Sequence, residues 1–255
     1  MEPIVYEQPL NERMRALLRL EFLYTKAAHH REASGEYDTR SALDVMFEIN
    51  EVAGRAELRG ELVKELERYA TNLSAMREHP GVDASLLDGV LGNLRELASK
   101  LSAMSGGSTG FIKDHELLSS LRQRSSIPGG ACAFDLPALH RWLQQPWPTR
   151  RNQVDSWYAR FEPVREATET LLQLTRQSAS STQETAEDGF FQAELDPNRP
   201  FQLVQVTLPL SVPVFPEVSG GRHRFTIRFM EQQDLGARPS QVHRDIDFQL
   251  RRCMI

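Results

Sequence analysis

The sequence predicts an α+β protein in which an N-terminal multi-helix bundle domain packs against a C-terminal antiparallel β-sheet domain. Two observations predict this class. From residue 9 to about residue 179, apolar residues recur at the three- and four-residue spacing of helices. After residue 189 the spacing becomes two, which is the period of strands with one buried face. An N-terminal edge strand is expected to complete the sheet.

These patterns set the expected domain boundaries. The helical domain is expected at residues 9–180, and the β-strand domain is expected to combine residues 1–8 with residues 189–255. The stretch at 178–189 reads SASSTQETAEDG and contains almost nothing to bury, which predicts a linker. With 255 residues and 40% hydrophobic content, the chain has enough apolar material for a real core.

Apolar stripes predict the helices in order. Asp83 precedes one stripe and is expected to cap its helix. Further helices are expected around Leu117–Leu121, after Pro137, from Thr149 to about Arg160, and from Pro163 onward. The first four stripes are Leu10, Met14, Leu17, Leu18 and Phe22; Leu43, Met46, Phe47 and Ile49; Leu58, Leu62, Val63, Leu66, Tyr69, Leu73 and Met76; and Leu86, Leu87, Val90, Leu91, Leu94, Leu97 and Leu101.

Alternating residues predict the strands. Residues 224–229 alternate basic or hydroxyl side chains with Phe225, Ile227 and Phe229. Residues 245–250 alternate acidic or amide side chains with Ile246, Phe248 and Leu250. Further candidate strands lie at 190–195, 201–208 and 212–215. We expect one antiparallel sheet of about four or five strands. Residues 4–6 can add an edge strand, and a bundle helix is expected to cover the apolar face.

Composition limits the function classes. The net charge of −5 and the pI of about 5.9 argue against a dedicated nucleic-acid binder, whose domain is usually basic. Only Cys132 and Cys253 are present, and the N-terminus lacks the pattern of a signal peptide, so we expect a cytoplasmic protein. No uncharged apolar run approaches the ~20 residues that span a bilayer. We therefore expect no direct membrane contact.

The segment from Leu121 to Leu143 is predicted to form a rigid corner between two helices. Arg122 and Arg124 close the first helix near its negative C-terminal end, and the Pro-Gly-Gly sequence at 128–130 stops it. Asp135 is expected to cap the second helix, with Pro137 in its first turn. Together with His140, these side chains predict a docking surface more than a catalytic centre.

The same segment contains the residue types of a thiol nucleophile site, which are Cys132, Asp135 and His140. Their spacing does not favour catalysis, because Asp135 suits a helix cap and Cys132 suits a small apolar filler. No CxxC or HxxxH spacing indicates a metal site. The glycines and the lysine of residues 106–113 lack the spacing of a phosphate-binding loop. We expect no catalytic residue, no metal and no cofactor.

Five segments carry a resemblance to a known family. They are PLNERMRALLRLEFL at 9–23, LRGELVKELER at 58–68, RQR, SIPGG, FDLP, LH and WL within 122–143, LLQLTRQSA at 171–179 and HRFTIRFM at 223–230. In this order they resemble the ZapD family of bacterial cell-division proteins over nearly the whole chain. The resemblance implies a cytoplasmic, non-enzymatic homodimer at the mid-cell division site, which binds the C-terminal tail of the tubulin-like protein FtsZ and bundles its filaments.

The arginines predict where such a tail binds. Arginine suits carboxylate recognition, although a GC-rich genome gives the same excess of arginine over lysine. On the strand at 223–230, Arg224 and Arg228 point to one side, where they are expected either to form a basic face or to pair with Asp245 and Asp247. We expect this face, the corner and the first helix to line one groove between the domains.

The resemblance assigns the site residues individually. It implies tail recognition or bundling for Arg19, Arg55, His140, Arg224 and Arg228, and it includes Arg122 and Arg124 in the RQR sequence, where they are expected partly to organise the corner. Glu116 stands where close relatives carry an arginine. The alternatives from the residues are a nucleic-acid binder that uses the same arginines on phosphates and, less favoured, a cysteine-dependent enzyme.

Overall fold

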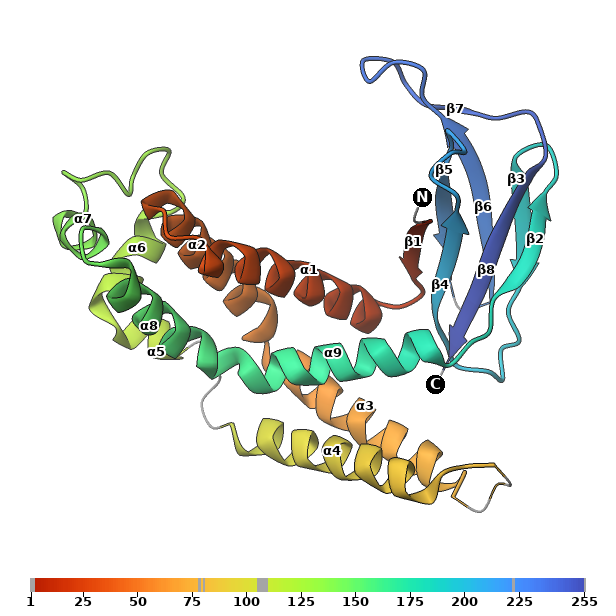
Figure 1. Ribbon diagram of the computed structural model, residues 1–255, viewed down its shortest axis with the longest axis horizontal. Helices are drawn as coiled ribbons and strands as arrows, with labels where there is room; N and C mark the ends of the chain where they lie inside the picture. The colour runs from red at the N-terminus through yellow and green to blue at the C-terminus, as the bar shows by residue number, and fades with distance from the viewer. Residues whose placement is uncertain (1–2, 78, 80, 105–109, 222, 255) are drawn as a thin grey trace. The chain divides into compact units, whose positions relative to one another are not determined.

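The α+β class and the N-terminal strand are confirmed by a computed structural model, which describes residues 3–254 except 78, 80, 105–109 and 222 (Figure 1). The chain divides into two compact units. Unit 1 combines Met1–Leu18 with Leu172–Ile255, and unit 2 is Arg19–Leu171. Both boundaries fall inside helices. The start of α1 and the end of α9 belong with the strands, because Arg13 donates to Gln202 of β4 and Arg176 donates to Glu7 of β1. The sequence led us instead to expect a helical domain over the whole of 9–180.

The helices follow the predicted stripes. α3 and α4 lie side by side and bury their leucines against each other (Figure 1). Asp83 caps α4 as predicted, because its carboxylate accepts hydrogen bonds from the backbone N–H groups of Ser85 and Leu86. The helices are α1 (Glu12–Glu32), α2 (Glu36–Ala53), α3 (Ala56–Ser74), α4 (Ala84–Ala103), α5 (Gly110–Asp114), α6 (Glu116–Arg124), α7 (Pro137–Leu143), α8 (Trp147–Tyr158), the 3₁₀ turn η1 (Ala159–Phe161) and α9 (Glu162–Gln177).

A buried arginine fixes α8 to the start of α2. Arg150 donates to the Thr39 hydroxyl at 2.5 Å, to the Ser34 carbonyl at 2.9 Å and to the Gln145 carbonyl at 3.1 Å. Since a buried guanidinium group needs such partners, these hydrogen bonds specify one arrangement of the chain. The start of α2, which they hold, is one wall of the corner described below.

Unit 1 contains two antiparallel sheets. Sheet A has the strand order β1-β4-β8-β2, and sheet B has the order β3-β6-β5, with β7 paired to β6. The strands are β1 (Ile4–Pro9), β2 (Thr182–Ala186), β3 (Phe190–Glu194), β4 (Phe201–Leu208), β5 (Phe215–Gly220), β6 (Arg224–Glu231), β7 (Ser240–Gln241) and β8 (Ile246–Met254).

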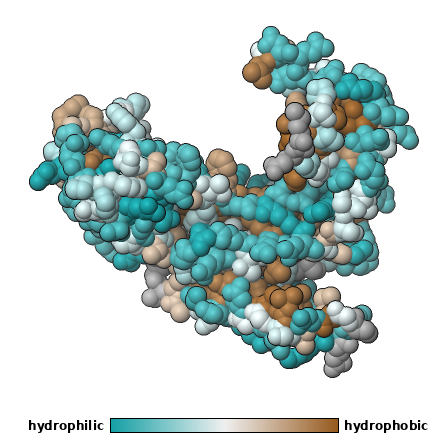
Figure 2. Space-filling model, in the orientation of Figure 1, coloured by the Kyte–Doolittle hydropathy of each residue, from teal (hydrophilic) through white to brown (hydrophobic). Residues whose placement is uncertain are grey.

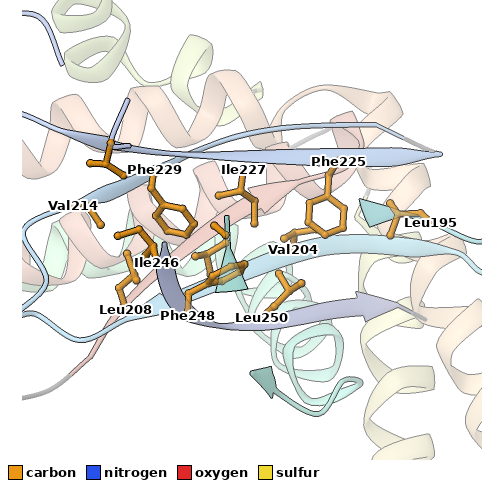
Figure 3. Close-up of a cluster of buried hydrophobic side chains, with 13 residues drawn as sticks. Leu195, Val204, Leu208, Val214, Phe225, Ile227, Phe229, Ile246, Phe248 and Leu250 are labelled. Atoms are coloured by element: carbon orange, nitrogen blue, oxygen red, sulfur yellow. The ribbon is translucent and has the colours of Figure 1, made fainter. Parts of the chain in front are cut away.

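The core of unit 1 lies between the two sheets. Phe225, Ile227 and Phe229 of sheet B are buried, and Figure 3 shows them with Phe248 and Leu250 of sheet A in one cluster. The predicted alternation on β6 and β8 is therefore confirmed. Because each of these side chains leaves water on folding, the cluster supplies most of the hydrophobic stabilisation of this unit.

Two predictions about the strands are wrong. We expected one sheet covered by a helix, but a second sheet covers the inner face of sheet A because the chain has enough strands for both. We expected a linker at 178–189, but Thr182–Ala186 form β2 and pair with β8. The segment is polar because β2 is an edge strand with a mostly exposed surface. A turn with positive φ at Asp188 and Gly189 then leads into β3.

Candidate functional site

The predicted corner is a hollow in unit 2. A cavity of about 620 Å³ is lined by the first turns of α2, the last turn of α6, the turn after it and His140 of α7. Arg124 and His140, two of the predicted site residues, both line it. The structure thus brings together side chains that are 16 positions apart in the chain. Figure 2 shows hydrophobic residues on the surface in this region, with hydrophilic residues around them.

The turn between α6 and α7 is held by hydrogen bonds of its own. Backbone N–H groups of Ile127 and Gly130 donate to the carbonyls of Arg124 and Ile127 at 3.0 and 2.8 Å. Gly129 has a φ of 72°, and a Cβ added at Gly130 would lie 2.7 Å from the Arg124 carbonyl oxygen. Both glycines are therefore required by the backbone. Arg40 also donates to the Ala131 carbonyl at 2.9 Å, which fastens the turn to α2.

Asp135 does not cap α7. The N-cap residue is Leu136, which makes no side-chain cap, while Pro137 occupies the first turn as predicted. Asp135 instead accepts a hydrogen bond from Arg124 at 2.7 Å and one from the Cys132 thiol at 3.2 Å. The guanidinium group competes better for this carboxylate than a backbone N–H does, because it brings a full positive charge. The expectation that Arg124 organises the corner agrees with this pair.

The thiol arrangement does not resemble an activated nucleophile. The Cys132 thiol is directed to Asp135, and no hydrogen bond within the described part of the chain joins Cys132 to His140. The described geometry therefore lacks the thiol–imidazole hydrogen bond by which a histidine activates a cysteine nucleophile. The described residues contain no group of three or more His, Cys, Asp or Glu side chains placed to hold a metal. Part of the segment 106–113 lies outside the described residues.

The second group of predicted residues lies on the outer face of sheet B. Arg224 and Arg228 are exposed there. The register places Glu194 of β3 opposite Arg224 and Glu217 of β5 opposite Arg228, so the face is mixed in charge and not purely basic. Among described residues, no carboxylate oxygen lies within 4.0 Å of either guanidinium group.

The alternative partners expected for these arginines are used elsewhere. Asp245 accepts from the backbone N–H of Asp188 at 3.0 Å, and Asp247 accepts from the Thr185 hydroxyl at 2.7 Å. The predicted pairing fails because β8 belongs to sheet A, whereas β6 belongs to sheet B. A sequence pattern gives the period of each strand but not the sheet that it joins.

The remaining predicted arginines lie in unit 2. Arg19 of α1 and Arg55, the N-cap residue of α3, are exposed, and Arg122 of α6 is half-buried. Within the described chain, none of the three makes an ion pair. Arg15, which shares a helix face with Arg19, is different because it pairs with Glu12. The arginines of this chain therefore divide into paired and unpaired groups.

Three apolar residues at the corner were not predicted as site residues. Tyr37 and Ile127 line the cavity with much of their surface exposed, and Phe134 follows the lining residue Ala133. The sequence carries one signal for two of them, since Ile127 and Phe134 flank the Pro-Gly-Gly turn and a turn places its neighbours at the surface. Tyr37 is brought to the same cavity as Ile127 only by the fold.

The described helices include none that is both long and apolar enough to cross a membrane. The sequence profile of the ZapD family, described as a cell division protein, matches residues 18–228. A relative from Methylococcus capsulatus, named cell division protein ZapD, is 40% identical over 252 residues, which cover 99% of this chain and 98% of the relative. The chain therefore belongs to the ZapD family of cell division proteins.

Proposed function

We propose that this protein is a non-enzymatic adaptor of cell division, which binds the C-terminal tail of FtsZ mainly through arginine side chains. As a homodimer it cross-links and bundles FtsZ filaments and so stabilises the division ring. The binding residues are Arg224 and Arg228 of unit 1 and a second set in unit 2. That second set is Arg19, Arg55, Arg122, Arg124 and His140.

One observation carries the proposal. Arg19, Arg55, Arg224 and Arg228 are exposed, and within the described chain no internal carboxylate neutralises them. A guanidinium group presents a planar fork of donors, which matches a carboxylate with two parallel hydrogen bonds. An acidic peptide can therefore gain these bonds without first breaking internal ion pairs. Membership of a cell division family supports FtsZ as the source of that peptide.

Bundling follows from having two copies of the site. A homodimer presents the same arginines twice, so that it can hold tails from two filaments at once. The second binding event is then intramolecular, and many weak contacts along a filament add up to stable cross-linking. A monomer with the same arginines would bind tails but would not bundle filaments.

The main test reverses the charge of the outer face of sheet B. The double variant Arg224→Glu, Arg228→Glu is expected to lose co-sedimentation with FtsZ polymers, because two attractive contacts become repulsive ones. Titration of a labelled FtsZ tail peptide should show at least a hundredfold weaker affinity, which corresponds to roughly 3 kcal/mol. The circular dichroism spectrum and the mass in sedimentation should not change, since both side chains are exposed.

A matched control separates this effect from net charge. Arg199→Glu with Arg238→Glu changes the charge by the same amount at two exposed arginines outside β3, β5 and β6. This control should keep co-sedimentation and tail affinity near the wild-type values. If the reversed face retains co-sedimentation, or if both double variants lose it equally, Arg224 and Arg228 are not the tail contacts and the proposal is wrong.

A further inference from the structure

We infer that the free edge of β1 is the contact between the two copies of the proposed homodimer, with β1 of one copy paired antiparallel to β1 of the other. This inference rests on the proposed function, which requires a dimer, and it adds the place where the two copies meet. β1 is the first strand of sheet A and has a strand paired to it on one side only (Figure 1). Sheet A of one copy then continues into sheet A of the other.

The edge of β1 that faces away from β4 carries unpaired backbone groups. The Leu10 N–H donates to the Gln202 carbonyl at 2.9 Å, which continues the register of β1 and β4. Because the hydrogen-bonded residues of an antiparallel strand alternate, the even-numbered residues of β1 bond to β4. Val5 and Glu7 therefore turn their N–H and C=O groups to the free edge. Among the described residues, no turn, loop or cap hydrogen bond involves the backbone of either residue.

This free edge is symmetric about Tyr6. Pro3 and Pro9, which have no N–H, stand three positions before and after Tyr6, in the same alternation as Val5 and Glu7. The edge therefore offers two residues with both backbone groups, bounded by a proline on each side. When a second β1 lies antiparallel with Tyr6 opposite Tyr6, Val5 of each copy faces Glu7 of the other. Each such pair exchanges both of its hydrogen bonds around one two-fold axis.

The side chains of the edge suit a second copy of the same strand. Ile4 is 37% exposed and Val5 is 50% exposed, so apolar surface lies at the edge. Glu7 is the one charged residue of β1, and its carboxylate is held by Arg176 at 2.7 Å. Two copies of the strand therefore do not repel each other. Exposed edges of monomeric sheets commonly carry unpaired charges that prevent pairing, and β1 lacks this protection.

The other strands at sheet edges are less suited to pairing. β2 consists of threonine, glutamine and glutamate with a single alanine, β3 ends in the exposed Glu194, and β5 contains Pro216. Charge and proline on an edge both weaken the addition of another strand. Among the described edge strands, β1 is therefore the one that favours a copy of itself.

Val5→Pro tests the contact, because it removes an N–H at the free edge and leaves the hydrogen bonds between β1 and β4 in place. We expect the sedimentation mass of the full-length protein to fall from dimer to monomer, with an unchanged circular dichroism spectrum. Bundling of FtsZ filaments should be lost, whereas the affinity for a labelled FtsZ tail peptide should stay near the wild-type value. Val5→Thr keeps the N–H and is the matched control, which should remain dimeric.

A cysteine on the proposed axis tests the register without a proline. Tyr6→Cys places two thiols opposite each other in a non-hydrogen-bonded pair, whose Cα atoms lie about 4.5 Å apart, within the range of a disulfide. Oxidised glutathione should therefore give a covalent dimer that a reducing agent separates. Ile4→Cys is the matched control, because its two copies lie on opposite sides of the axis and too far apart to bond. The wild type controls for Cys132 and Cys253.

A dimer that persists in folded Val5→Pro would overturn the inference. So would a dimeric Tyr6→Cys protein that forms no more disulfide-linked dimer than Ile4→Cys. If the circular dichroism spectrum shows that Val5→Pro does not fold, the two cysteine variants decide alone. Failure of the proposed function looks different, since the wild type itself would then sediment as a monomer or would not bind the tail.

Discussion

The outer faces of the two sheets of unit 1 use arginine in opposite ways. On sheet A, Arg176 from the last turn of α9 donates two hydrogen bonds, at 2.8 and 2.7 Å, to the carboxylate of Glu7 on β1. Gln205 of β4 donates to the same carboxylate at 2.7 Å. On sheet B, Arg224 and Arg228 point into solvent, and within the described chain they form no ion pair.

This difference separates folding from recognition. Arg176 and Glu7 are mostly buried, with 27% and 19% of their side chains exposed, so that each needs the other to offset desolvation. An exposed arginine is already solvated and gives almost nothing to stability. Its guanidinium group can therefore bind a partner with little effect on the stability of the fold. We expect the free energy of unfolding to depend on the first kind of arginine and tail affinity to depend on the second.

The largest expected effect on stability comes from Arg176→Met. Methionine keeps much of the volume but leaves the carboxylate of Glu7 without its cationic partner. We expect a loss of about 2–4 kcal/mol in the free energy of unfolding, measured by urea denaturation with circular dichroism. Tail affinity at low urea should be unchanged as long as the protein stays folded. A loss below about 0.5 kcal/mol would show that the pair is no more important than a surface ion pair.

The pH dependence of the same variant gives an independent check. Burial opposes ionisation of Glu7, but the hydrogen bonds from Arg176 and Gln205 outweigh it and hold the pKa of Glu7 below its ordinary value of 4.5. A lowered folded-state pKa gives stability that is present above the unfolded pKa and is lost as pH falls through the folded one. The difference between wild type and Arg176→Met should therefore be largest at neutral pH and shrink in acid. If the difference in the free energy of unfolding is the same at neutral and at acidic pH, the destabilisation comes from lost packing and not from the lost ion pair.

The sequence could predict the elements better than their assembly. The stripe after Asp83 and the alternation of Phe225, Ile227 and Phe229 are local patterns, and the structure confirms both. The strand at residues 182–186 could not be predicted from a local pattern, because its residues are mostly polar and form a strand only by pairing with β8. The resemblance to a family was confirmed by comparison with known proteins.

The candidate site likewise combines features that a local pattern predicts with features that only the assembled fold determines. Exposure of Arg224 and Arg228 followed from a period of two, but the glutamates opposite them come from strands whose order no period specifies. The role of Asp135 could not be derived either. Position in the sequence favoured a helix cap, whereas the fold brings the Arg124 guanidinium group close enough to take the carboxylate. Which donor binds the Asp135 carboxylate depends on distances in the folded chain, which the sequence pattern does not give.

Arg124→Gln tests an arginine that is paired with a carboxylate, like Arg176, but is more exposed to solvent. Arg124 is paired with Asp135, yet 44% of its side chain is exposed, so solvent screens the pair. We expect a loss of less than about 1 kcal/mol in the free energy of unfolding by urea denaturation. A double-mutant cycle with Asp135→Asn should give a coupling energy in the same range. A coupling above about 2 kcal/mol would place Arg124 with Arg176, as a residue on which folding depends.

The smallest effect on stability, and the sharpest contrast, is expected on sheet B. Arg228→Gln should change the free energy of unfolding by no more than about 0.5 kcal/mol, because the side chain is exposed and unpaired. It should nevertheless weaken tail binding by about threefold to tenfold in the peptide titration, since one charge-assisted contact is lost.

Glu217→Gln should act in the opposite direction on the same contact. Glu217 lies opposite Arg228 in the register of β5 and β6, and its negative charge repels an approaching carboxylate while it attracts the guanidinium group. Removing that charge should raise tail affinity by about twofold to fivefold, which corresponds to the energy of one cross-strand pair. If affinity falls instead, Glu217 holds Arg228 in its binding position, and the outer face of sheet B then resembles that of sheet A, where a carboxylate fixes an arginine in place.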